Sequence, residues 1–275
     1  MQGRKDGGGS PCCPAWLSAC GSACMHACLP QRRPACKYGY MPVITVAATK
    51  GGVGKTTLAY ELAAAMDGVL VDLDWDSGGA TRMWGYDPAS FKRAPLLDAM
   101  EAGPAVVPRP RRRRNQPDLI PSHPALAASD IPDLVIADCL SAWAKQWDRP
   151  VIADTHPGAN ALTDGAMQVA DLVVVPVILA AREMDALAGM LNDFADYRLL
   201  LVPNMVPPSP PRRYVERLAE LAGDKPVAPP ISEHRWMRRR VRRSALTLQP
   251  NPGRQVQRVA DELQTLARVV EKHCV

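Results

Sequence analysis

The segment Thr49–Thr57, TKGGVGKTT, holds the residues whose types and spacing predict chemistry most directly. Three glycines surround a valine, and Lys55, Thr56 and Thr57 follow at once. Glycines let a loop turn several backbone N–H groups toward one anion, and a helix that begins there adds the positive end of its dipole. The Lys55 ammonium can then reach the β- and γ-phosphates of a nucleotide, while the Thr56 hydroxyl can bind Mg²⁺. The segment therefore predicts a phosphate-binding loop.

The residues on either side predict the strand and the helix that such a loop needs. Residues 43–49, VITVAAT, are β-branched or small and predict a buried strand. Residues 55–66 predict a helix with Leu58, Leu62 and Met66 on one face. Further strands are predicted at 69–74, 150–155, 170–177 and 198–204, and further helices at 132–147, 183–197, 211–223 and 253–273.

Apolar strands that alternate with helices are typical of a parallel sheet covered on both faces. We therefore predict the α/β class, with a single P-loop NTPase domain, a mostly parallel sheet and helices on both faces. Residues 103–132 are rich in Pro and Arg and predict a loop with short elements. No apolar run reaches the length of a membrane span, which is about 18 residues.

The first 40 residues differ from the rest because they hold six of the eight cysteines. A disulfide framework would need an oxidising compartment. A metal site could use Cys20, Cys24 and Cys28, which recur at helical spacing, but no CxxC pair supports it. We predict instead that residues 1–40 form a disordered extension or reflect a misassigned start, and that the domain spans 41–275. The remaining Cys139 and Cys274 are far apart, which favours a reducing, cytoplasmic setting.

Lys50 lies just before the first glycine, so the loop reads K-G-G-V-G-K-T-T. This pattern resembles the deviant Walker A motif of the ParA/MinD family of ATPases. The resemblance implies ATP hydrolysis with Mg²⁺ in a homodimer, in which Lys50 reaches across the interface to the partner's nucleotide. The catalytic residues would be Lys50, Lys55 and Asp74. The nucleotide would be held by Gly51, Gly52, Val53, Gly54, Lys55, Thr56, Thr57 and Asn204.

Three more segments resemble the family. VLVDLDWD resembles its second acidic strand, which implies that Asp74 orients the attacking water and Asp72 supports the Mg²⁺ shell. VIADTHPG resembles the Walker B strand and switch loop, with Asp154 reaching Mg²⁺ through water. Asn204, at the end of LLLVPN, would contact adenine. The implied metal set is Thr56, Asp72 and Asp154.

The sequence departs from the family pattern at two places. Trp75 and Asp76 replace the usual Pro-Gln after the second acidic strand, which leaves the details of that loop open. His156 replaces a proline of the switch loop, and we expect it to face solvent.

Net charge is +5, and arginine occurs in runs, at 111–114 and 238–243. Basic patches are compatible with nucleic acid, although either run alone could be a solvated loop. Nonspecific DNA contacts, as in ParA-like members, are predicted for Arg235, Arg238, Arg239, Arg240, Arg242 and Arg243, with surface ion pairs as the alternative.

We therefore expect a small ParA-type ATPase, 41–275, without an N-terminal helix-turn-helix domain. It would segregate plasmid or chromosome with a ParB-like partner and associate with the nucleoid. The last helix lacks aromatic residues, so no membrane attachment is expected. Two alternatives stay open: a ParA-like ATPase that positions a protein cargo, and a P-loop small-molecule synthetase.

Overall fold

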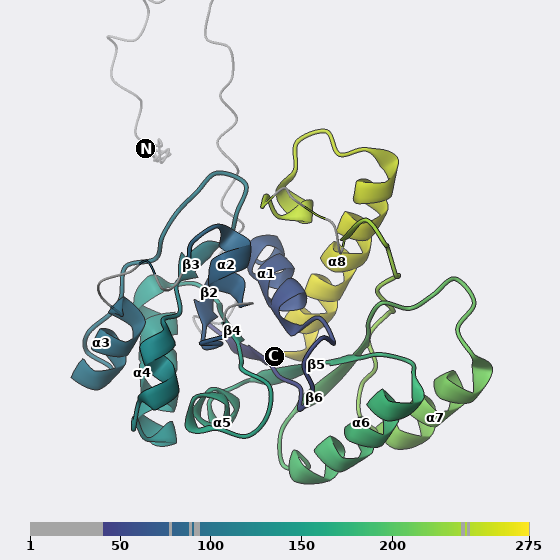
Figure 1. Ribbon diagram of the computed structural model, residues 1–275, viewed down its shortest axis with the longest axis horizontal. Coiled ribbons are helices and arrows are strands. Elements are labelled where there is room, and N and C mark those ends of the chain that lie inside the picture. Colours follow the sequence, from purple (N-terminus) through teal and green to yellow (C-terminus); the bar gives the residue numbers. More distant parts are fainter. Residues whose placement is uncertain are drawn as a thin grey trace, which may run out of the picture. The chain divides into compact units, whose positions relative to one another are not determined.

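Six parallel strands form one sheet in the order β3-β2-β4-β1-β5-β6 (Figure 1). The computed structural model describes residues 41–76, 79–87, 90, 94–237, 240 and 243–274. The predicted extension 1–40 therefore lies outside the described residues. The predicted parallel sheet is confirmed. The strands are β1 (Val43–Val46), β2 (Val69–Asp72), β3 (Asp118–Ile120), β4 (Val151–Asp154), β5 (Leu172–Val177) and β6 (Leu199–Pro203).

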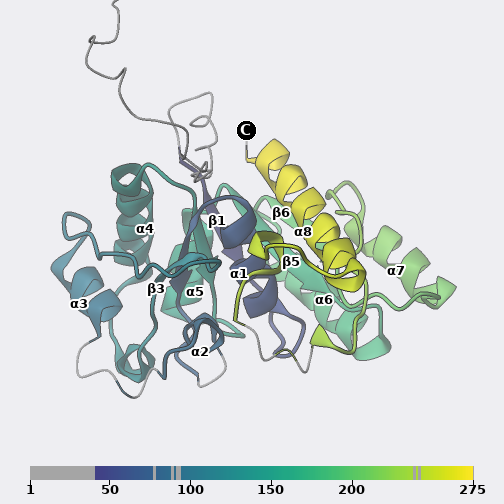
Figure 2. The same ribbon diagram turned by 90° about the horizontal axis from the view of Figure 1, so that it is seen from above.

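Helices cover both faces of the sheet (Figures 1 and 2). On one face, α1, α2, α8 and the short 3-10 helix η4 pack on Ile44, Leu70 and Val174. On the other face, α3, α4 and α5 cover β2 and β4, while α6 and α7 cover β5 and β6. The helices are α1 (Lys55–Ala65), α2 (Ala80–Trp84), α3 (Pro95–Ala102), α4 (Asp133–Trp147), α5 (Ala161–Gln168), α6 (Ala181–Asp193), α7 (Arg212–Ala222) and α8 (Arg254–His273), with η2 (Pro124–Ala128) and η4 (Leu246–Leu248).

Hydrophobic periodicity predicted the long helices within a few residues but missed α2, α3 and α5. These helices have five to eight residues, too few for a repeat of 3.6 to show in the sequence. Strand β3 lies within 103–132, where short elements were expected. In the part of the chain that the structure describes, every helix is too short or too polar to cross a bilayer.

Helix α1 packs between the sheet and α8, and almost all of its side chains are buried. One of them is charged: Glu61 is fully buried and accepts hydrogen bonds from Arg240 Nη1 at 2.7 Å and Leu246 N at 2.8 Å. Burial raises the pKa of Glu61, and the Arg240 guanidinium opposes that shift. The preceding Tyr60 donates its hydroxyl to the Arg243 carbonyl at 2.5 Å. The nucleotide-loop helix therefore holds the arginine-rich segment through two adjacent side chains.

Glu61→Gln is expected to lower the free energy of unfolding by about 3 kcal/mol, because it removes the buried carboxylate that pairs with the Arg240 guanidinium. The matched control is Glu216→Gln, which breaks an exposed pair with Arg212 on α7 and should cost about 0.5 kcal/mol or less. Urea unfolding of both variants measures the difference. Equal, small losses would show that the buried pair does not hold the segment.

Candidate functional site

The carboxyl ends of β1, β2 and β4 bring the loop and two aspartates together. In the register of the sheet, Asp154 lies beside Val46 on one side and beside Asp72 on the other. Both carboxylates are fully buried. The phosphate-binding loop follows the end of β1, so helix α1 begins next to this acid pair. Parallel α/β sheets bind ligands at this edge.

The loop between β1 and α1 requires glycine at two positions. Gly52 and Gly54 have φ angles of 79° and 95°, in the left-handed region that side chains with a Cβ rarely adopt. Helix α1 begins at Lys55, and Leu58 N donates to the Gly54 carbonyl at 3.0 Å. The predicted nucleotide-binding residues 51–57 thus occupy the turn and the first residues of α1, as the sequence pattern required.

Asn204 supports this turn directly. Its buried amide donates from Nδ2 to the Val53 carbonyl at 2.8 Å, and a Cβ at Gly54 would lie 2.4 Å from the same nitrogen. Asn204 is itself fixed at the end of β6, where its N–H donates to Val177 O at 2.7 Å. Sequence reasoning missed this supporting role, because Asn204 and Val53 are 151 positions apart. The contact with adenine that was predicted for Asn204 stays a prediction.

The two lysines of the loop have different surroundings. Lys55 is buried, with its ammonium 3.3 Å from the Lys50 carbonyl. Burial lowers the pKa of Lys55, whereas the negative charges of Asp154 and Asp74 raise it. Lys50 lies at the surface, and its ammonium donates to the Arg182 carbonyl at the start of α6, at 2.8 Å. The reach of Lys50 across a dimer interface stays a prediction.

The two buried aspartates differ in the hydrogen-bond donors that surround them. Asp72 accepts from Thr81 N and Thr81 Oγ1, both at 2.6 Å, and from Asp74 N at 3.1 Å. Burial nevertheless raises the pKa of Asp72 to about 7. Its carboxylate thus holds the start of α2. Thr81 was not foreseen from the sequence, since it lies on a five-residue helix without a visible pattern.

Asp154 is the acid that fits a cation. Neither of its buried oxygens has a partner of normal hydrogen-bond geometry among the described residues, although the Thr56 hydroxyl lies close enough to this carboxyl to favour its charged form. Burial, and then the charge of Asp72, raise the pKa of Asp154 well above its usual range. A buried carboxylate without partners is costly, so a cation or an ordered water is the natural occupant. Thr56 and Asp154 supply the oxygen ligands that Mg²⁺ prefers, directly or through water.

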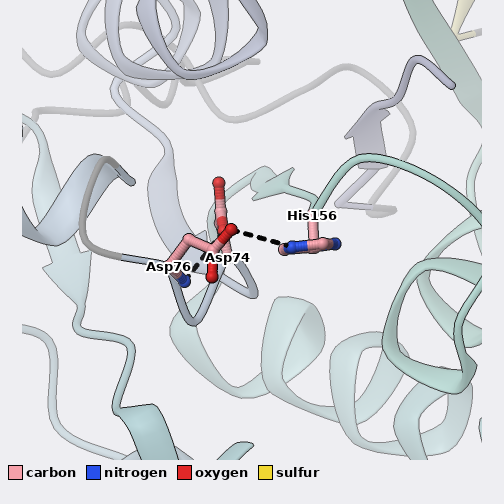
Figure 3. Close-up of side chains that lie close together, drawn as sticks. All are labelled: Asp74, Asp76 and His156. Carbon is pink, nitrogen blue, oxygen red and sulfur yellow. Dashed lines mark hydrogen bonds and ion pairs between the residues drawn. The ribbon is translucent and has the colours of Figure 1, made fainter. Parts of the chain in front are cut away.

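The two departures from the family pattern contact each other (Figure 3). His156 was expected to face solvent, but only 21% of its side chain is exposed. Its ring stacks on Trp75, with centroids 4.0 Å apart and planes at 6°, and its Nε2 lies 3.1 Å from Asp76 Oδ2. This contact joins the loop after β2 to the loop after β4. Sequence reasoning could not pair them, because 80 positions separate Asp76 from His156.

Asp74 lies within this same group. Its Oδ1 accepts from Asp76 N at 3.1 Å, and one ligand atom from each of Asp74, Asp76 and His156 lies within 4.8 Å of the others. Their spacing would admit a divalent cation. Burial raises the pKa of Asp74. The loop contacts therefore fix the position of the residue that was predicted to orient water.

A cavity of about 450 Å³ opens beside the loop. It is of the size that small ligands occupy. Its lining includes Thr57 from α1, Asn204 and Met205 after β6, and His234, Met237 and Arg243 from the segment before η4. A nucleoside attached to phosphates in the loop would extend into this space.

The predicted DNA-binding arginines differ in their exposure to solvent. Arg235 and Arg243 are exposed. Arg240 is not: its side chain is 8% exposed and paired with Glu61, so it does not lie on the surface as predicted. Arg238, Arg239 and Arg242 lie outside the described residues.

The glycine turn at the start of α1, its buried lysine and the acid pair at the strand ends define a P-loop nucleotide-binding protein. A protein-family model described as AAA domain (AAA_31) matches residues 41–204, which is more than half of the chain. The chain therefore belongs to this family, and its loop and fold are those of a ParA-type P-loop protein.

Relatives agree with this assignment. The sporulation initiation inhibitor protein Soj of Bacillus subtilis is 26% identical over 162 residues, which cover 54% of this chain and 63% of Soj. The chain thus spans less than two thirds of that curated relative. The ParA family ATPase from Chlorobium tepidum superposes with a TM-score of 0.66 at 15% identity, covering 84% of this chain and 98% of that one.

The cobyrinic acid a,c-diamide synthase of Mycobacterium smegmatis, solved with ADP and magnesium, superposes with a TM-score of 0.62 at 22% identity. The match covers 85% of this chain and 95% of the synthase. Likeness at these identities shows the fold. The same fold therefore occurs both in a ParA family ATPase and in a synthase.

Gly54→Ala is expected to abolish nucleotide binding, because the new methyl group would meet Asn204 Nδ2 and the backbone would be strained at a φ of 95°. Gly189→Ala on α6 is the matched control: nothing lies within 4 Å of its added Cβ, and alanine favours the helix. Calorimetric titration with ATP and Mg²⁺ compares the two. Unchanged affinity in Gly54→Ala would contradict the described turn.

The free energy of unfolding of the ligand-free protein is expected to fall as the pH rises from about 4 to 7. The Asp72 carboxyl, with a pKa of about 7 in the folded state, holds a proton that the unfolded chain releases near pH 4. Its stabilising contribution is complete below pH 4 and is lost as the pH rises through 7, by up to about 1.4 kcal/mol per pH unit. Asp72→Asn should flatten this part of the profile in urea unfolding without metal or nucleotide; an unchanged slope would exclude the assignment.

Proposed function

We propose that this chain is an ATP-dependent, dimerising partition ATPase that binds DNA nonspecifically and segregates a plasmid or chromosome with a ParB-like partner. The observation that carries this proposal is the loop with two lysines, set against the buried acids at the strand ends. Association with the nucleoid follows from the DNA binding. The proposal takes ATP and Mg²⁺ as the cofactors.

Binding rests on the loop and on Lys55. The backbone N–H groups at the start of α1 face a phosphate, and the Lys55 ammonium, which burial has stripped of water, adds a positive charge beside them. Thr56 and Asp154 would hold Mg²⁺, which would supply positive charge against the phosphates. The unpartnered oxygens of Asp154 support this role.

Turnover rests on Asp74 and Lys50. The Asp74 carboxylate, fixed by Asp76 N and next to the His156 loop, orients the attacking water. Lys50 must leave the Arg182 carbonyl to reach the nucleotide of a second subunit, where its charge stabilises the phosphates in the transition state. Hydrolysis thereby depends on dimerisation.

Two other functions use the same site. A ParA-like ATPase that positions a protein cargo would hydrolyse ATP without salt-sensitive DNA binding, so a DNA-binding titration with ATP separates it from the partition function. A small-molecule synthetase is favoured by the fold that the chain shares with the cobyrinic acid a,c-diamide synthase. Such an enzyme would not turn over ATP steadily without its second substrate.

Asp74→Ala is expected to keep ATP-dependent dimers and to lose at least about a hundredfold in hydrolysis rate, because the water is no longer oriented. Lys55→Ala is the control that should lose ATP binding and dimers together. Light scattering with ATP and Mg²⁺ measures the dimer, and phosphate release measures turnover. Hydrolysis at the normal rate in Asp74→Ala would remove this residue from the mechanism.

A further inference from the structure

Two arginine-rich segments that are far apart in the sequence lie side by side. Ala245 N donates to the Asn115 carbonyl at 2.8 Å, and Gln116 Nε2 donates to the Arg243 carbonyl at 3.1 Å, across 127 positions. Figures 1 and 2 show the segment between α3 and β3 running beside the chain that leads into η4. The run 111–114 therefore joins the end of the second arginine-rich segment.

Arginines from three segments meet around the end of α2. The Arg113 guanidinium carbon lies 5.1 Å from the centre of the Trp84 ring. Arg243 Nη1 donates to the Gly85 carbonyl at 3.1 Å. Arg82 belongs to α2 itself. Arg113 and Arg243, which are more than 100 positions apart in the sequence, thus both contact the end of α2.

The run 111–114 begins at the edge of the sheet with Arg111 and continues into a turn at Arg114. Arg111 and Leu119 form an antiparallel bridge, with N–H···O distances of 2.7 and 2.9 Å. All four side chains of the run are exposed. In the described part of the chain the run forms one ion pair, between Arg112 and Asp118, and the Arg112 side chain is still 76% exposed. Most of this positive charge therefore faces solvent without a neutralising acid.

We propose that Arg82, Arg111–Arg114 and Arg243 form one arginine surface that binds the phosphate backbone of duplex DNA. This inference rests on the DNA binding of the proposed function and assigns it to a surface that the run 235–243 alone does not provide. Guanidinium groups bind phosphate oxygens through paired hydrogen bonds. Contacts of this kind do not depend on base sequence.

A duplex fits this surface better than a single strand. Binding to single strands relies on exposed aromatic rings on which bases stack. Here Trp84 is 2% exposed, and Tyr86 stacks against it with ring centroids 4.9 Å apart. The Trp84 ring is therefore buried, and one face of the half-buried Tyr86 ring is covered by it, which leaves little aromatic surface for bases to stack on.

The test is a triple variant, Arg111→Ala with Arg112→Ala and Arg114→Ala, which leaves the Arg113–Trp84 contact in place. The matched control is Arg212→Ala with Arg213→Ala and Arg217→Ala, which removes the same charge from exposed positions on α7, on the other face of the sheet. Affinity for a duplex is measured with ATP and Mg²⁺ at several salt concentrations. ATP hydrolysis without DNA should be unchanged in both variants.

In the test variant, the slope of log affinity against log salt should fall by about 2 to 3, since each phosphate contact contributes about 0.9. Affinity at low salt should fall at least about tenfold, and the control should keep the slope of the wild-type protein. Arg114→Glu, a single change at an exposed side chain, should weaken binding without lowering the thermal unfolding midpoint.

If the wild-type protein hydrolyses ATP but binds no duplex at any salt concentration, the partition function is overturned together with this surface. If the wild-type protein binds with a steep salt slope and the test variant keeps that slope, the arginine surface is overturned and the partition function stands. Tighter binding to a single strand of the same length than to the duplex would contradict the choice of ligand.

Discussion

The site depends on two carboxylates, Asp72 and Asp154, that are kept buried side by side at the ends of neighbouring strands. Burial raises the pKa of both, so two charged carboxylates are electrostatically costly at this place. Three hydrogen bonds support Asp72, whereas among the described residues only the Thr56 hydroxyl lies near enough to Asp154 to stabilise its charge as a donor. The cost is offset by the Lys55 ammonium and, in the proposed function, by a cation. A stable fold is thereby combined with an affinity for cation-bound phosphate.

Helices α1 and α2 connect this acid pair to the basic surface. Helix α1 begins at the phosphate loop and holds the arginine-rich segment through Glu61 and Tyr60. Helix α2 binds Asp72 with Thr81 at its first turn and carries Trp84 and Arg82 at its other end. The nucleotide site and the arginine surface therefore share two short, rigid elements. In a partition ATPase, this arrangement would let a bound nucleotide change the affinity of the arginine surface for DNA.

The unusual residues of the loops after β2 and β4 form one contact. Trp75 stacks on the ring of His156, and Asp76 makes a polar contact with the same ring, which Figure 3 shows. In the resembling family the first loop carries Pro-Gln and the second a proline, so both departures fall on the same spot. The stack and the polar contact join the loop of Asp74 to the loop after β4.

The sequence by itself determined the phosphate loop, the parallel sheet and the long helices, because glycine positions and apolar periodicity are local signals. It also determined the family, through Lys50 and the aspartates at the strand ends. Only the tertiary structure decided which partners these residues have: Asn204 beneath Gly54, Glu61 against Arg240, and His156 on Trp75. The members of the last two pairs are 179 and 81 positions apart, and spacing in the chain carries no information on such pairs. For the same reason Arg240 was placed on the surface from its sequence run, while packing buries it.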